Sequence, residues 1–286
     1  MPRQGSGSAG GIAQGVMSMP IVFKAIMPHG DELLPFSPED AALLPLRRSM
    51  AAIGAALRRA APDVLVIASP HHLRVPGHLA IADTAYAEGQ VTSGRDSYRR
   101  QVSIDRRFND VLAAAAARAG LPPARAGFQT AEGPLSTLPL DFGTLVPLHY
   151  LIGQGTSPPV CIVGPPRDLG IVPLVRFGAE IARGAGERRV AFVASADLAH
   201  AHRPDGPYGY DPAAATYDAE AQAAAFRGDL GPLCALPDSL IAAAKPDAPW
   251  QVAILHGMMP EPVPARDAAY GRPSYFGMMT ARFDAP

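Results

Sequence analysis

Short apolar runs recur along this chain and are separated by longer segments in which apolar residues return every three or four positions. The runs are rich in valine, isoleucine and alanine and are bounded by charged or turn-forming residues. Such runs are typical of strands buried on both faces of a sheet. They predict strands at residues 21–27, 63–69, 79–83, 160–163 and 190–195, and a final strand at residues 275–283.

The segments with helical spacing carry the expected start and stop signals. Ser37 is expected to cap the first helix, with Pro38 in its first turn, and Gly120 ends the second helix before two prolines. The polar segment at residues 88–100 predicts a long surface loop, and residues 138–148 predict a loop leading into a short helix. Helices are expected at residues 37–59, 104–119, 174–182, 213–226, 237–244 and 250–258.

The alternation of strands and helices favours an α/β fold. We expect a single domain with a central, mostly parallel or mixed sheet flanked by helices on both faces. Residues 1–19 are rich in glycine, serine and glutamine and are predicted to be a disordered leader. Residues 20–286 would then form the folded domain, since no internal repeat or second linker is evident in the sequence.

Charge and cysteine content exclude several classes of function. The formal net charge is -1, and the arginines and lysines are scattered, which argues against nucleic-acid binding. No apolar run approaches the roughly 18 residues that a membrane span needs. The two cysteines, Cys161 and Cys234, lack a metal-binding or redox spacing. We therefore expect a cytoplasmic protein that binds neither nucleic acid nor membrane.

Titratable side chains gather at the ends of three predicted strands. His29 follows the first strand, His71 the second, and Asp197 and His200 follow the strand at residues 190–195. Ligands bind open α/β sheets in the crevice beyond the carboxyl ends of the strands, so these side chains are expected to meet there. Two histidines with one carboxylate form the facial triad of non-haem Fe(II) sites, which leaves coordination positions open.

Five short motifs, in order along the chain, resemble those of the class III extradiol ring-cleavage dioxygenases. That superfamily includes the catalytic subunit of protocatechuate 4,5-dioxygenase and the Memo-like proteins, and the resemblance covers residues 21–283. The motifs are Pro28-His29-Gly30, Ser69-Pro70-His71-His72, the segment Asp141-Phe142-Gly143-Thr144-Leu145-Val146-Pro147-Leu148, Ser195-Ala196-Asp197-Leu198-Ala199-His200 and Gly209-Tyr210-Asp211-Pro212.

The resemblance implies roles for individual residues. His29 and His71 would be iron ligands, His200 would be the acid/base residue beside the bound catecholate, and Asp197 would orient groups in the same pocket. His72 is the alternative to His71, because a shift of one residue would exchange them. We favour His71 because side chains alternate along a strand and the Ser-x-His pattern ends the strand there.

The third ligand is a point at which this chain departs from the family. The family usually supplies a glutamate just before the last apolar helix, and the Memo branch has a cysteine there. Here the aligned segment, residues 245–250, contains Asp247 as its carboxylate. Asp247 is therefore either the third iron ligand or a helix cap, with Pro249 in the first turn of the helix.

A second departure affects the chemistry. The family commonly has Asp-His-Gly where this chain has Phe142 as the middle residue. A phenyl ring cannot move a proton, so His200, or a relocated group such as His202 or His149, would carry the proton transfers. His72, Phe142 and His202 are expected to line the substrate pocket. Alternatively, the protein has lost ring cleavage.

Two hypotheses follow. The first is a non-haem Fe(II) extradiol dioxygenase that cleaves a small aromatic diol of the catechol type with O2. The alternative is a Memo-like metal-binding or regulatory homologue without ring cleavage. Some relatives have a second subunit, so a homo-oligomer or a second chain is compatible with either hypothesis.

Overall fold

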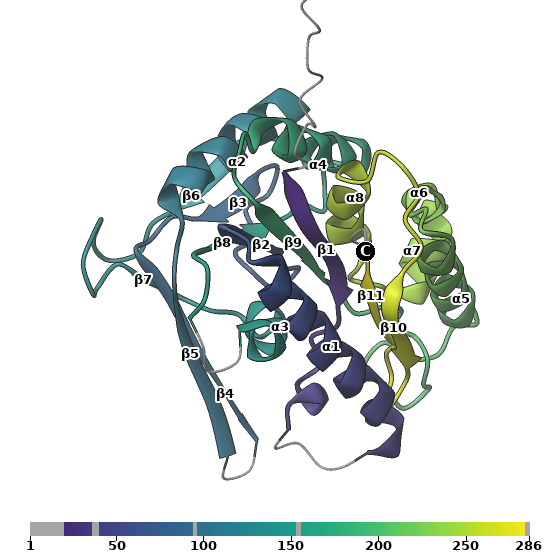
Figure 1. The fold of residues 1–286 in the computed structure, drawn as a ribbon. Coiled ribbons are helices and arrows are strands. Elements are labelled where there is room, and N and C mark those ends of the chain that lie inside the picture. The colour runs from purple at the N-terminus through teal and green to yellow at the C-terminus, as the bar shows by residue number, and fades with distance from the viewer. Residues whose placement is uncertain (1–19, 36–39, 94–95, 153–155, 284–286) are drawn as a thin grey trace, which may run out of the picture.

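The strands predicted from the apolar runs form the centre of one mixed sheet of eight strands (Figure 1). The structure is a computed structural model, and it describes residues 20–35, 40–93, 96–152 and 156–283. The strands are β1 (Ile21–Met27), β2 (Val64–Ala68), β3 (Leu79–Ala82), β4 (Tyr86–Ser93), β5 (Asp96–Ser103), β6 (Pro123–Ala126), β7 (Thr137–Pro139), β8 (Val160–Gly164), β9 (Val190–Ser195), β10 (Arg266–Gly271) and β11 (Met278–Arg282). The helices are α1 (Leu44–Ala60), α2 (Arg106–Ala119), α3 (Phe142–Ile152), α4 (Val172–Gly184), α5 (Ala213–Arg227), α6 (Gly231–Cys234), α7 (Asp238–Ala244) and α8 (Pro249–Gly257), with 3₁₀ turns η1 (Asp31–Leu33) and η2 (Ala41–Leu43).

Four parallel strands form the centre of the sheet. The strand order is β10-β11-β1-β9-β2-β8-β3-β6, and β1, β9, β2 and β8 run parallel to one another. In register, Met27 lies opposite Ser195, and Ala68 lies opposite both Ala194 and Val163. The carboxyl ends of the four strands therefore reach one edge of the sheet at the same level. Because β11 and β3 pair antiparallel at the two sides, the sheet is mixed, as predicted.

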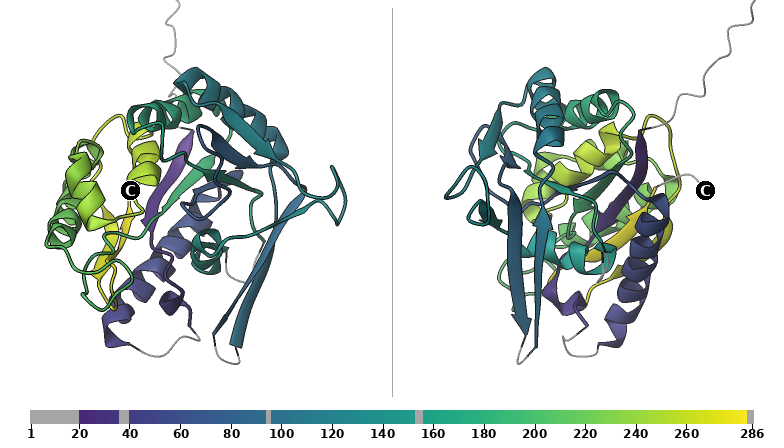
Figure 2. Two further views of the ribbon diagram at one scale, coloured as in Figure 1. Left: turned by 180° about the vertical axis from the view of Figure 1, so that it is seen from behind. Right: turned by 60° about the vertical axis from the view of Figure 1, so that its left-hand side comes forward.

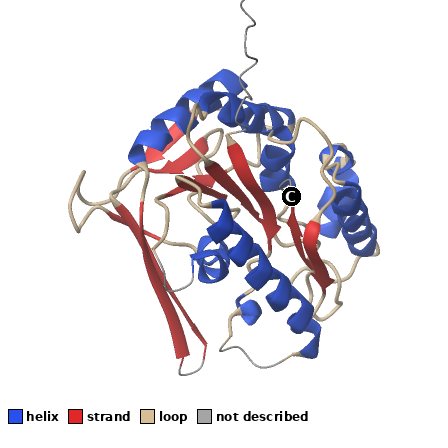
Figure 3. Ribbon diagram, in the orientation of Figure 1, coloured by secondary structure: helices blue, strands red, loops and turns tan. Residues whose placement is uncertain are grey.

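Helices cover both faces of the sheet, which confirms the predicted α/β architecture (Figures 2 and 3). Neighbouring residues of one strand point into different cores: Phe192 of β9 packs with α2, α4 and α8, whereas Val193 packs with α1 and α3. This alternation explains why the central strands are apolar throughout. The group formed by α5, α6 and α7 lies beside the edge of the sheet that carries β10 (Figure 1).

Two helices approach each other closely enough to fix the position of α8. A Cβ atom at Gly178 of α4 would lie 1.9 Å from the carbonyl oxygen of Ile254, and one at Gly257 of α8 would lie 1.9 Å from that of Val175. The two backbones are therefore in direct contact, which no larger residue at either glycine would permit. Because Asp247 lies just before α8, this packing also sets the height of that carboxylate above the sheet.

The prediction of a surface loop at residues 88–100 was wrong. Strands β4 and β5, at residues 86–93 and 96–103, form an antiparallel hairpin that joins β7 in a second, three-stranded sheet and projects from the body (Figure 1). One face of the hairpin contacts the protein, where Val102 is buried and the Tyr98 ring packs on His149 with centroids 4.8 Å apart. Exposed positions such as Gln90, Thr92, Ser97 and Gln101 are polar, so the segment resembles a loop in composition.

Other element boundaries differ by a few residues. The predicted cap Ser37 lies outside the described residues, and α1 begins at Leu44 after the η2 turn, where the Asp40 carboxylate accepts a hydrogen bond from the Ala42 amide at 2.8 Å. Asp105 caps α2 through a 2.9 Å bond from the Phe108 amide. The short elements β6, α6 and β10 were not predicted. The proposed leader, residues 1–19, also lies outside the described residues, and among those described no helix is long and apolar enough to cross a membrane.

Candidate metal centre

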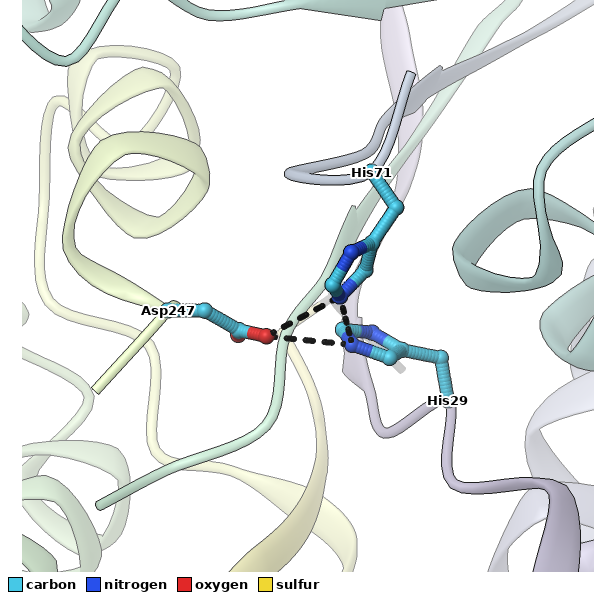
Figure 4. A group of neighbouring side chains, drawn as sticks. All are labelled: His29, His71 and Asp247. Carbon is cyan, nitrogen blue, oxygen red and sulfur yellow. Dashed lines mark hydrogen bonds and ion pairs between the residues drawn. The ribbon is translucent and has the colours of Figure 1, made fainter. Parts of the chain in front are cut away.

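Three predicted ligands meet at the carboxyl edge of the central strands. His29 follows β1, His71 follows β2, and Asp247 precedes α8 (Figure 4). The His29 and His71 Nε2 atoms are 3.1 Å apart, and Asp247 Oδ2 lies 3.1 Å from the first and 3.4 Å from the second. Among the described residues, this is the one group of three or more His, Cys, Asp or Glu side chains with ligand atoms all within 4.8 Å.

The spacing of these atoms fits a single metal ion. Two ligands that bind one ion at about 2.1 Å and subtend a right angle lie about 3.0 Å apart, close to the separations found here. His29 is 1% exposed and Asp247 is buried, whereas the side chain of His71 is 32% exposed. An ion held here would therefore be enclosed on the His29 side and open to a ligand on the His71 side.

Ser195 determines that His29 Nδ1 carries a proton. The Ser195 hydroxyl donates its hydrogen to the Gly143 carbonyl oxygen, and its oxygen lies 2.9 Å from His29 Nδ1. A hydroxyl has one hydrogen to donate, so Nδ1 must donate to Ser195. His29 Nδ1 is therefore protonated, which leaves Nε2 to bind the metal once any second proton has left.

Two buried carboxylates accept hydrogen bonds from backbone amides of other segments of the site. The His29 amide donates to Asp197 Oδ1 at 3.1 Å, and the Asp197 amide donates to Asp247 Oδ1 at 2.9 Å. Asp197 Oδ2 also lies 3.3 Å from His29 Nε2. Helix α8 has Ala248 as its cap residue and no side-chain capping bond. Asp247 therefore faces the histidines and does not cap the helix.

The three charges in this cluster shift one another's pKa values. Burial acts to raise the pKa of Asp247, but the His29 charge and hydrogen bonds from His29 and His71 outweigh it and hold the pKa below its usual range. Burial acts to lower the pKa of His29, but Asp197 and Asp247 raise it to about 9. Burial, together with Asp247, raises the pKa of Asp197 to about 7 against the effect of His29. The metal-free site therefore holds an imidazolium against a carboxylate.

The structure distinguishes His71 from His72. Ser69 donates to Asp141 Oδ1 at 2.5 Å and accepts a bond from the His71 amide at 3.2 Å, which directs the His71 ring towards His29. His72 is buried, with Nδ1 3.8 Å from Asp141 Oδ2, and burial lowers the pKa of its ring. The cluster therefore contains His71 and not its neighbour.

Phe142 lies at the open side of the cluster. It is the first residue of α3, and its ring is 46% exposed. The ring centroid is 4.2 Å from that of His71 and 5.7 Å from that of His29. The position expected to differ from the family thus contacts a predicted ligand directly.

His200 lies in an aromatic group beside the cluster. Its Nδ1 is 2.9 Å from the Leu198 carbonyl oxygen, to which it must donate. The ring stacks on Phe276 with centroids 5.2 Å apart and meets the edge of Tyr208 at 5.6 Å. Burial lowers the pKa of His200, although the nearby Asp247 charge acts to raise it. His200 is therefore neutral at neutral pH.

The structure does not bring His202 or His149 to the cluster. His202 is buried, with Nε2 2.8 Å from Asp218 Oδ2 and Nδ1 3.0 Å from an Arg272 nitrogen. His149 lies near the far end of α3, where its ring contacts Tyr98 and Tyr150. Both ring nitrogens of His202 are occupied by protein groups, so a role in substrate binding would require that network to open.

Comparison with known proteins identifies the family. A family model described as the catalytic LigB subunit of aromatic ring-opening dioxygenase matches residues 25–279. The chain belongs to this family. It is 27% identical over 179 residues to Protein CA_C1420 of Clostridium acetobutylicum, and the match spans 60% of this chain and only 37% of that protein. The LigB fold is shared with the crystal structure of uncharacterized protein JW3007 from Escherichia coli K12, with a TM-score of 0.61 and 14% identity over 92% of this chain and 99% of that one.

Reasoning from the sequence missed two features of this LigB site. Ser195 was quoted within a motif but was given no role, although a polar residue at the end of an apolar strand is a recognisable signal. Tyr208 belongs to a loop whose path is not fixed by local pattern, so its contact with His200 was not foreseen.

Replacing Ser195 should weaken metal binding without unfolding the protein. Ser195→Ala removes the acceptor that keeps His29 Nδ1 protonated, and loss of such a partner typically lowers metal affinity about 10- to 100-fold. Anaerobic Fe(II) titration against a competing chelator measures the change. Ser49→Ala is the matched control, because Ser49 is buried in another part of the molecule and bonds Thr280 at 2.6 Å. Equal affinities in the two variants would contradict the role of Ser195.

Metal binding should release a proton at neutral pH. The pKa of His29 is raised to about 9, so Nε2 carries a proton at lower pH and must lose it before it can bind a metal. Apparent affinity should therefore rise by up to about tenfold per pH unit towards pH 9 and level off above it. Calorimetry at about pH 7.5 in buffers of different ionisation enthalpy counts the protons released. A count near zero would show that His29 is already neutral.

Proposed function

We propose that this protein is a non-haem Fe(II)-dependent extradiol dioxygenase that cleaves the ring of a catechol-type aromatic with O2. The observation that carries the proposal is the convergence of His29, His71 and Asp247, with one open side, in a member of the ring-opening dioxygenase family. Two imidazoles and one carboxylate with free positions beside them suit non-haem Fe(II) oxygenases.

The residues of the site would have different roles in this reaction. His29, His71 and Asp247 would hold the iron. When bound, the iron would supply Lewis-acid activation of the diol and an electron path between the aromatic ring and O2. Phe142 lines the open side with an apolar ring, which favours an aromatic substrate lying against it.

His200 is suited to proton transfer. It is neutral, it lies within the electrostatic influence of His29 and Asp247, and its orientation is fixed by the bond from Nδ1 to the Leu198 carbonyl. With Nδ1 donating, Nε2 presents a lone pair that can take a proton from a substrate hydroxyl and later return it. Stacking on Phe276 holds the ring in this orientation.

The exposed Phe142 ring supports a second candidate function. An apolar ring beside His71, at a position where the family commonly has histidine, removes one group able to move protons. That observation favours a Memo-like metal-binding or regulatory homologue that keeps the fold and the ligands. The alternative predicts full iron retention without ring cleavage.

Adjacent histidines provide the test of the ligand set. His71→Ala should lose iron while His72→Ala retains it, because only the first contacts Asp247. His29→Ala should lose iron while His78→Ala, whose ring bonds the Pro76 carbonyl at 2.8 Å on the surface, retains it. Iron analysis of purified, anaerobically loaded proteins measures both pairs. Equal iron within either pair would remove that ligand assignment, and intact iron with no ring-cleavage product from a panel of catechols would favour the Memo-like alternative.

Introducing a histidine at Phe142 should raise the ring-cleavage rate. The position is exposed, so an imidazole there stays hydrated and avoids the cost of burial. General acid/base groups contribute roughly 10²- to 10⁴-fold, and we expect an increase of about tenfold or more in kcat for Phe142→His with unchanged iron content. Phe142→Leu is the control, since it is apolar and cannot transfer a proton. A histidine variant no faster than the leucine variant would show that Phe142 serves only as a pocket wall.

A further inference from the structure

The fourth central strand also delivers a charged side chain to the site. Strand β8 ends at Gly164, and Arg167 follows after two prolines. An Arg167 nitrogen donates to the Pro70 carbonyl oxygen at 3.1 Å, and the guanidinium carbon lies 4.6 Å from the centre of the Trp250 ring. Pro70 immediately precedes His71, and Trp250 follows Asp247 by three residues. Arg167 is thus fixed between the two segments that carry these predicted ligands.

A second arginine shares the pocket beside Arg167. The pocket has a volume of about 240 Å³, and both Arg74 and Arg167 line it together with apolar groups such as Pro165. Its one acidic lining residue is Asp168, which already accepts a hydrogen bond from the Gly77 amide at 2.8 Å. Two positive side chains therefore face a small, partly apolar pocket formed by the segment that follows His71 and the segment that follows β8.

The surroundings of Arg167 act on the pKa of its guanidinium in both directions. Burial and the like charge of Arg74 lower the pKa of Arg167, while Asp247 and Tyr208 act to raise it. Asp247 and Tyr208 are therefore near enough to the guanidinium to influence its charge. A bound anion would relieve the repulsion between the two arginines.

We propose that Arg167, assisted by Arg74, binds a carboxylate on the side chain of the aromatic diol substrate. This inference rests on the proposed function, because it places the diol at His29, His71 and Asp247. The planar guanidinium matches a carboxylate through two parallel hydrogen bonds. Because Trp250 and Pro70 already fix the guanidinium, little side-chain entropy is lost when the anion binds. The substrate class is therefore a catechol with an anionic arm, and Arg167 is its specificity-determining residue.

The test compares two ligands of which one carries a carboxylate and the other its neutral methyl ester. Dihydrocaffeate carries a carboxylate on a short arm, and its methyl ester keeps the ring, the diol and the arm without the charge. Binding of each to anaerobic, iron-loaded protein is measured by calorimetry in the wild type, Arg167→Gln, Arg167→Lys, Arg74→Gln and Arg118→Gln. Arg118 is the matched control, since it lies on α2 and pairs with Glu180 at 2.7 Å, away from the site.

We expect the wild type and Arg118→Gln to bind the acid about tenfold or more tightly than the ester, the scale of a charge-assisted pair. Arg167→Gln should lose this preference through weaker binding of the acid, with ester affinity and iron content unchanged. Arg167→Lys should keep part of the preference, and Arg74→Gln should reduce it. If Arg167→Gln fails to fold or to hold iron, the Arg74→Gln variant provides the test instead. Arg74 is exposed, so its replacement should leave the fold intact.

The outcomes separate this inference from the proposed function. Equal binding of acid and ester by iron-loaded wild type overturns the carboxylate site and leaves the dioxygenase proposal standing. An unchanged preference in Arg167→Gln, or in Arg74→Gln where that variant decides, overturns it as well. If iron-loaded protein binds neither ligand, the proposed function fails, and the inference fails with it.

Discussion

One buried imidazole between two buried carboxylates is the interaction on which the rest of the site depends. Burying Asp197 and Asp247 is costly unless each is compensated, and here the compensation comes from His29 and from backbone amides. The His29 amide bonds Asp197, and the Asp197 amide bonds Asp247, so the exits of β1 and β9 and the start of α8 are tied together. The site is therefore preorganised by the fold, and a metal ion would replace a proton in an existing cluster.

Several buried polar residues do not contact the cluster but form hydrogen bonds that hold the segments around it. Asp218 accepts bonds from the Ala199 amide at 3.0 Å and the Tyr270 hydroxyl at 2.8 Å, and it also bonds His202. These bonds anchor the loop that carries His200. His202, which was predicted to line the substrate pocket, is therefore part of a buried hydrogen-bond network behind His200.

Much of this architecture could be predicted from the sequence, because buried parallel strands leave a continuous apolar signal and their exits share one edge of the sheet. That rule brings together His29 and His71. The hairpin of β4 and β5 escaped prediction because only one of its faces is buried, and β6 and β10 escaped because short edge strands carry little apolar signal. The contact of Tyr208 with His200 depends on loop paths, which local patterns do not determine.

The three predicted ligands differ in their exposure to solvent, and this difference limits the side from which another molecule can reach them. His29 and Asp247 are enclosed by protein, whereas His71 is partly exposed and has the Phe142 ring against it. A molecule that approaches His71 from solvent would therefore meet the Phe142 ring. His29, His71 and Asp197 follow the ends of central strands and Asp247 precedes α8, whereas Phe142 lies in the first turn of α3. Substitution of a histidine by Phe142 can thus alter proton handling without disturbing the ligands, since the carboxylates and Ser195 that fix His29 lie on the enclosed side. Metal binding and proton transfer would therefore depend on different residues of this chain.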